Sequence, residues 1–146
     1  MTELTEDTSR RFDVELFIIH PTIDPAEITA TLGLEGHVIH RVGDTRKTPK
    51  GTVLSGTYPD TRWRHCVEHT VEGQWFARQL AEFIAGLVAH KQFLAKLRAS
   101  GGRASVIIQF LGHGYFGDQV SMETLARLVD LESDFAIECF SEPQSG

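Results

Sequence analysis

The chain has 146 residues, of which 41 % are hydrophobic and 23 % are charged, and it contains nine Phe, two Trp and two Cys. This composition predicts one domain over residues 1–146, with residues 1–10 and 141–146 as flexible termini, that folds without a disulfide or structural metal. The formal net charge of −6 argues against binding to nucleic acid or to an anionic membrane.

The sequence also predicts a cytoplasmic location. The start MTELTEDTSRR is polar and carries no apolar stretch of signal-peptide length. No run approaches the roughly 20 apolar residues that a membrane-spanning helix needs. In a reducing compartment Cys66 and Cys139 are expected to remain thiols.

The first predicted element is a strand over residues 12–19. Its apolar side chains first alternate with Asp13 and Glu15 and then run without interruption to Ile19. A strand that is apolar on both faces is expected at the centre of a sheet. Asp13 and Glu15 share one face and are interpreted as solvated unless a partner covers them.

A short helix of about two turns follows this strand. Asp24 is a suitable N-cap, Pro25 suits the first helical position, and Glu27 stands where a capping box requires it. Gly33 can end the helix in the left-handed conformation.

The middle of the chain predicts strands and a loop. Residues 37–42 are interpreted as a strand, and residues 43–51 (GDTRKTPKG) as a loop. Residues 52–58 and 61–68 predict the two arms of a β-hairpin. An exposed edge strand at 61–68 could pair with its copy, so a homodimer is considered.

The second half begins with a long helical segment, residues 73–99, whose apolar residues follow helical spacing. A single helix there would span about 40 Å, so we expect a break near residues 90–92. Gly101-Gly102 ends the segment, and residues 104–110 predict another strand.

The last elements are a glycine-rich loop, a helix and a strand. The loop LGHGYFGDQ precedes Ser121, which is expected to cap the helix. In the strand 135–140, Cys139 is interpreted as a small core residue. The whole order predicts an α+β fold, a mostly antiparallel sheet of about five to six strands with helices packed mainly on one face as a two-layer sandwich.

Charge is distributed unevenly along the chain. Residues 1–35 contain eight acidic and two basic residues, whereas residues 41–64 contain six basic and two acidic ones. The basic segment is interpreted as a solvated loop and edge strand, with contact to an anion as the alternative. The residues assigned to such an anionic ligand are Arg41, Arg46, Arg62, Trp63, Arg64, His113 and Tyr115.

The run His65-Cys66-Val67-Glu68-His69 contains residue types that bind metals. Neighbouring side chains of a strand point to opposite faces, so His65 and Cys66 are not expected to converge on one ion. We therefore predict no metal and no cofactor, with His65 beside Trp63 and His69 solvated. His20, His37 and His40 could form a pH-sensitive cluster only if the fold gathers them.

The glycine-rich loop at residues 112–117 lacks the lysine and Ser/Thr of a phosphate-binding P-loop. It is interpreted as a flexible connection that leaves Tyr115 and Phe116 partly exposed. No Ser-His-Asp pattern is recognised either, so no catalytic residue is predicted and the interpretation leans towards a protein that is not an enzyme.

Several of these segments together resemble the bacterial domain-of-unknown-function family 4279, over roughly residues 12–140. The matching residues are Asp24-Pro25, Ile28-Thr29, Leu32-Gly33, Gly43-Asp44, Thr48-Pro49, Gly51 and Trp63. A proline expected soon after Leu34 is replaced by Glu35-Gly36. The resemblance implies a compact α+β domain and no established activity.

Two functions are kept apart at this point. The first is a non-enzymatic protein-interaction module, comparable to an immunity protein, whose acidic surface binds a basic partner. The alternative is a domain that binds a small anionic ligand through the basic segment 41–64 and the loop 112–117.

Overall fold

The computed structural model describes residues 11–70 and 75–140. Its main sheet has five strands in the order β2-β5-β1-β6-β7. The bounds of these strands are β1 Arg11–His20, β2 Val38–His40, β5 Thr61–Thr70, β6 Arg103–Leu111 and β7 Ser133–Phe140. All neighbouring strands are antiparallel except β6 and β7. The α+β class and the mostly antiparallel sheet are therefore confirmed.

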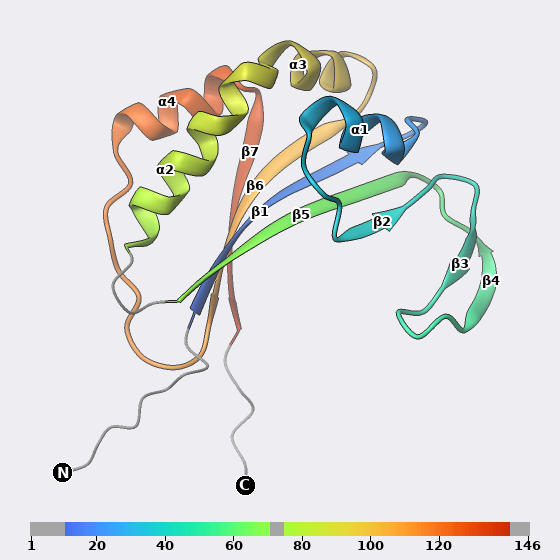
Figure 1. Ribbon diagram of the computed structural model, residues 1–146, viewed down its shortest axis with the longest axis horizontal. Coiled ribbons are helices and arrows are strands. Elements are labelled where there is room, and N and C mark those ends of the chain that lie inside the picture. Colours follow the sequence, from blue (N-terminus) through green and yellow to red (C-terminus); the bar gives the residue numbers. More distant parts are fainter. Residues whose placement is uncertain (1–10, 71–74, 141–146) are drawn as a thin grey trace, which may run out of the picture.

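The helices lie together against one face of this sheet (Figure 1). They are α1 Pro25–Leu32, α2 Phe76–Leu87, a 3-10 turn η1 Val88–His90, α3 Lys91–Ala99 and α4 Met122–Asp130. Their buried residues, such as Ile28, Leu80 and Leu128, form one core with the inward-facing side chains of β1, β5 and β6. None of the described helices is long and apolar enough to cross a membrane.

β1 occupies the centre of the sheet, as its pattern predicts. Val14, Leu16 and Ile18 are fully buried beneath the helices. Since β1 pairs along nearly its whole length with β5 on one side and β6 on the other, its backbone groups are satisfied by neighbouring strands.

The predicted helix ends are also confirmed. The Asp24 side chain accepts a hydrogen bond from the Ala26 N–H, and Gly33 ends α1 with a left-handed φ of 67°. Ser121 caps α4 by accepting from the Thr124 N–H. The long helical segment breaks at η1, close to the predicted position. Residues 73–74 of that predicted segment and the termini expected to be flexible lie outside the described residues.

The predicted hairpin of residues 52–58 and 61–68 is wrong. Strand β4, Val53–Thr57, pairs instead with β3, Thr45–Lys47, inside the segment interpreted as a loop. All five residues of β4 are exposed, so this strand has no apolar face to bury in the main sheet. β5 does have one, because Trp63 is 0 % exposed, and it pairs with β1 and β2.

Two further expectations need correction. β5 is not an edge strand along residues 62–64, where β2 flanks it. Cys139 is exposed rather than part of the core. Cys139 lies near the end of β7, which is the edge strand of the sheet. Ile137, two residues earlier on the same face of this strand, is also exposed.

Candidate functional site

The most distinctive surface is the face of the sheet opposite the helices, which no helix of the described residues covers (Figure 1). Alternation along β1 sends Asp13, Glu15, Phe17 and Ile19 to this face. Among the described residues, the side chains of neighbouring strands shield them. We call this surface the open face.

Carboxylates line up across one end of the open face. Glu68 of β5 is paired with Asp13 of β1, Asp13 with Gln109 of β6, and Gln109 with Glu138 of β7. The Gln109 amide donates a 2.9 Å hydrogen bond to Glu138. Neighbouring strands are about 4.8 Å apart, so this line is about 15 Å long. Glu68, Asp13 and Glu138 are called the acidic row.

The expectation that Asp13 and Glu15 are solvated is wrong, since each residue is only 4 % exposed. Two arginines shield them. Arg11 Nε lies 3.0 Å from Asp13 Oδ1, and Arg64 Nη1 donates a 2.8 Å hydrogen bond to Glu15 Oε2. The Arg64 guanidinium also lies 4.1 Å from the centre of the Phe17 ring. The two arginine side chains therefore shield the carboxylates of Asp13 and Glu15 from water on this face of the sheet.

Carboxylates outnumber basic groups around the acidic row. Burial, reinforced by the charges of Asp13, Glu15 and Glu68, raises the pKa of the Cys66 thiol to about 11. Burial also raises the pKa of Glu15, with Glu138 and Asp13 adding to the shift and Arg64 opposing it. Burial is the main cause of both shifts, and the contributions of the neighbouring carboxylates reflect a local excess of negative charge, which attracts cations.

The opposite end of the open face carries two arginines. Arg62 of β5 lies opposite Ile19 of β1, which lies opposite Arg103 of β6. Each arginine has its own carboxylate: Arg62 Nε is 2.9 Å from Asp60 Oδ1, and Arg103 Nη2 is 3.8 Å from Asp134 Oδ2. The charges at this end are thus balanced, whereas the other end has more carboxylates than guanidinium groups.

The structure distributes the residues assigned to an anionic ligand over separate places. Arg62 and Arg64 share the open face, but the buried Trp63 points to the helices and donates a 3.0 Å hydrogen bond to Thr29 Oγ1. Arg41 is 3.7 Å from Asp24, and Arg46 donates to the Ser55 carbonyl within the β3–β4 hairpin.

His113 and Tyr115 lie far from that group. Their loop follows Leu111, which lies at the Thr70 end of the sheet, and Arg62 is eight residues away from Thr70 along β5. That spacing corresponds to about 26 Å. Tyr115 is 84 % exposed, in line with the predicted exposure of this loop.

The side chains of the histidine-rich run, residues 65–69, alternate between the two faces of β5. His65 faces the helices and lies 6.3 Å from both the Trp63 and Phe83 rings, whereas Cys66 faces the opposite side. His69 is stacked on Phe12 at 5.0 Å and is not a solvated loop residue. In the part of the chain that the structure describes, no three His, Cys, Asp or Glu side chains are grouped as a metal site would require.

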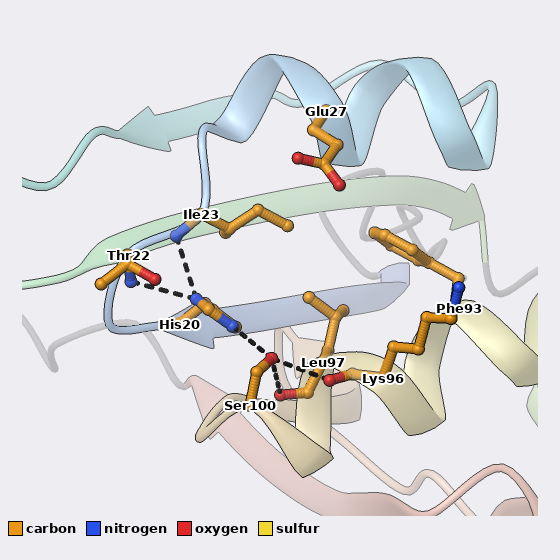
Figure 2. A pocket seen from close by; sticks show the side chains of 8 residues that line it. All are labelled: His20, Thr22, Ile23, Glu27, Phe93, Lys96, Leu97 and Ser100. Atoms are coloured by element: carbon orange, nitrogen blue, oxygen red, sulfur yellow. Dashed lines mark hydrogen bonds between the residues drawn. The ribbon is translucent and has the colours of Figure 1, made fainter.

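A cleft of about 290 Å³ lies on the helix side, between α1, α3 and the segment that follows β1 (Figure 2). Its lining residues are His20, Thr22, Ile23, Glu27, Phe93, Lys96, Leu97 and Ser100. A second hollow of about 260 Å³ is lined mainly by apolar groups, and His65 and His90 also line it.

His20 is held rigidly in the wall of the first cleft. Its Nδ1 accepts 3.0 Å hydrogen bonds from the N–H groups of Thr22 and Ile23, so the proton of the neutral ring is on Nε2. Nε2 lies 2.8 Å from Ser100 Oγ, and that hydroxyl donates to the Lys96 carbonyl. Burial lowers the pKa of His20. The ring therefore cannot take a proton from Ser100, and the pair is not an activated nucleophile.

Sequence reasoning noted His20 and Glu27 but missed the cleft. Glu27 is explained locally as part of a helix start, and nothing in the sequence connects it with Lys96. The spacing of α3 does predict which of its residues face the core, but not that its last turn meets the end of β1.

With this geometry established, comparison with known proteins identifies the family. The family model described as a domain of unknown function (DUF4279) matches residues 9–139. The chain is a DUF4279 domain. The resemblance carried by Asp24-Pro25, Thr48-Pro49 and Trp63 is thereby confirmed. No curated protein and no solved structure matches the chain.

Proposed function

We propose that this DUF4279 domain is a protein-interaction module that binds a basic surface of a partner protein through the acidic row on its open face. A role like that of an immunity protein, which neutralises a basic partner, is one form of this proposal and rests on analogy of general character.

The proposal rests on the concentration of carboxylates on the open face, which no described helix covers. Asp13, Glu15, Glu68 and Glu138 share this end of the sheet with two guanidinium groups, those of Arg11 and Arg64. Complementary charge on a partner accelerates association and selects against partners of the wrong sign. Glu68 is well exposed, so it is accessible to such a partner.

The buried carboxylates support a rigid surface rather than a flexible one. Asp13 and Glu15 are each fixed by an arginine, and the Arg64 side chain is also packed on Phe17. A surface whose charged groups are already held in place loses less conformational entropy when it binds.

The experiment compares three immobilised proteins for their capture of proteins from native lysate of the source organism. The first is the wild type, and the second is Glu68→Gln/Glu138→Gln, which neutralises the exposed Glu68 and the half-buried Glu138 and leaves both buried pairs intact. The third is Glu35→Gln/Asp44→Asn, a control with the same change of net charge at exposed positions outside the open face.

We expect a basic protein to be retained in stoichiometric amount by the wild type and the control, released by salt, and lost from the row variant. Equal retention by all three proteins, or retention by none, contradicts the proposal. Light scattering is run beforehand: a wild-type dimer that the row variant does not form would identify a second copy as the occupant and would also contradict it.

The alternative function, binding of a small anionic ligand, can now use fewer of the residues assigned to it from the sequence. Arg62 and Arg64 share a surface, but His113 and Tyr115 lie at the other end of β5. A thermal-shift screen with nucleotides and phosphorylated metabolites tests this alternative, with Arg62→Ala/Arg64→Ala as the variant that should lose the ligand.

A further inference from the structure

We infer that the cleft beside His20 binds a small zwitterion, a free α-amino acid with an apolar side chain, between Glu27 and Lys96. This inference is independent of the proposed partner, because the cleft lies on the helix side of the sheet (Figure 2), whereas strand register places the acidic row on the opposite face.

Two exposed side chains of opposite charge, Glu27 and Lys96, line this cleft. Figure 2 shows the Glu27 carboxylate directed from α1 towards the cleft and the Lys96 side chain extending along α3 on the other side. On the same helix segment, Lys91 and Arg98 are paired with Asp130 and Glu132. Neither Glu27 nor Lys96 forms an ion pair with any residue that the structure describes.

A molecule that carries both an ammonium and a carboxylate group satisfies both charges at once. Its ammonium would meet Glu27 and its carboxylate would meet Lys96. Both side chains are exposed, so each charge is hydrated in the free protein, and a ligand with one charge would engage only one of the two. This is the reason for choosing a zwitterion rather than a simple anion or cation.

Apart from Thr22, the rest of the lining is apolar or already hydrogen-bonded. Ile23, Phe93 and Leu97 supply carbon surface, which suits an aliphatic or aromatic side chain. His20 uses Nδ1 and Nε2 for hydrogen bonds within the protein, so it acts as a fixed wall. The volume of about 290 Å³ is at the small end of the range for ligand pockets, which favours a ligand of amino-acid size.

The walls of the cleft are formed in advance. Thr61 Oγ1 donates a 2.6 Å hydrogen bond to the Ile23 carbonyl, which fixes the segment after β1. Gly102 allows α3 to approach closely, because a Cβ there would lie 2.7 Å from the His20 ring. A cleft with such fixed walls binds a small ligand without a large ordering cost.

The test is isothermal titration calorimetry of the full chain with L-leucine and L-phenylalanine, each up to about 10 mM. N-acetyl-L-leucine, which lacks the ammonium, and L-leucinamide, which lacks the carboxylate, serve as ligand controls. The protein variants are Glu27→Gln and Lys96→Met, with Glu35→Gln and Lys50→Met as matched exposed controls. Circular dichroism verifies that each variant is folded.

We expect at least one of the two free amino acids to bind, with affinity reduced about tenfold or more in Glu27→Gln and in Lys96→Met but unchanged in the controls. The acetylated and amidated compounds should bind far more weakly. Three results would each overturn the inference: no heat from either free amino acid, equal affinity for the cleft variants and the wild type, or equal binding of a compound with one charge.

Discussion

Arg64 and Glu15 form a hydrogen-bonded ion pair across β5 and β1, with Arg64 Nη1 2.8 Å from Glu15 Oε2. The pair is asymmetric, because the Glu15 side chain is 5 % exposed and that of Arg64 is 35 % exposed. The buried negative charge of Glu15 is therefore stabilised mainly by Arg64, whereas the guanidinium of Arg64 is also in contact with water. This relationship determines how the open face responds to mutation.

Arg64→Met is expected to destabilise the domain by about 1–3 kcal/mol, because it leaves a buried carboxylate without its partner. Adding Glu15→Gln should recover part of that loss. Arg62→Met, on the neighbouring position of the same face, should cost under about 1 kcal/mol because its pair with Asp60 is more exposed. Urea denaturation measures all four proteins. Similar losses for Arg64→Met and Arg62→Met would contradict this account of the open face.

The two cysteines should differ strongly in reactivity. The pKa of Cys66 is raised to about 11 by burial and by neighbouring carboxylates, whereas Cys139 is exposed. At about pH 8 a thiol reagent should therefore modify Cys139 first and Cys66 slowly, since the thiolate is the reactive form. Peptide mapping by mass spectrometry follows each site. Equal rates at that pH would contradict a raised pKa for the Cys66 thiol.

The pH dependence of stability follows from His20. Its pKa in the folded protein is lowered from 6.5 by burial, so the folded ring remains neutral where the unfolded ring takes up a proton. The stability contributed by the neutral ring is complete above about pH 6.5 and is lost as the pH falls towards the lowered pKa. NMR titration of the His20 ring should give a pKa below 6.5 and the Nε2–H form. A pKa at or above 6.5 would contradict this assignment.

Two glycines should respond to alanine in opposite directions. A Cβ on Gly36 would lie 2.5 Å from Trp63 Nε1, and the buried Trp63 ring is tied to Thr29. Gly36→Ala is therefore expected to cost roughly 1–3 kcal/mol through overpacking. A Cβ on Gly86, within α2, would meet nothing within 4 Å, so Gly86→Ala should stabilise the domain by about 0.5–1 kcal/mol. Thermal or urea unfolding measures the stability of both variants. Destabilisation by both substitutions would contradict the predicted opposite effects.

The features that the sequence predicted well are local ones. The central position of β1 follows from apolar residues on both of its faces, and the ends of α1 follow from Asp24 and Gly33. Each of these signals is contained in a few neighbouring residues.

The features that it missed depend on contacts between distant residues. Glu15 is covered by Arg64, 49 positions away, and His20 is fixed by Ser100, 80 positions away. The β3–β4 hairpin was missed because strand pairing depends on competition: β5 has buried Trp63 to place in the main sheet, and β4 has only exposed residues.

The measurement that tests the central claim most directly is the affinity of the captured partner for the wild type and for Glu68→Gln/Glu138→Gln, at about 50 mM and about 200 mM salt. We predict that the wild type binds more tightly at low salt and weakens as salt rises, while the row variant binds weakly at both concentrations with little salt dependence. The same affinity and the same salt dependence for the two proteins would show that the acidic row is not the binding surface.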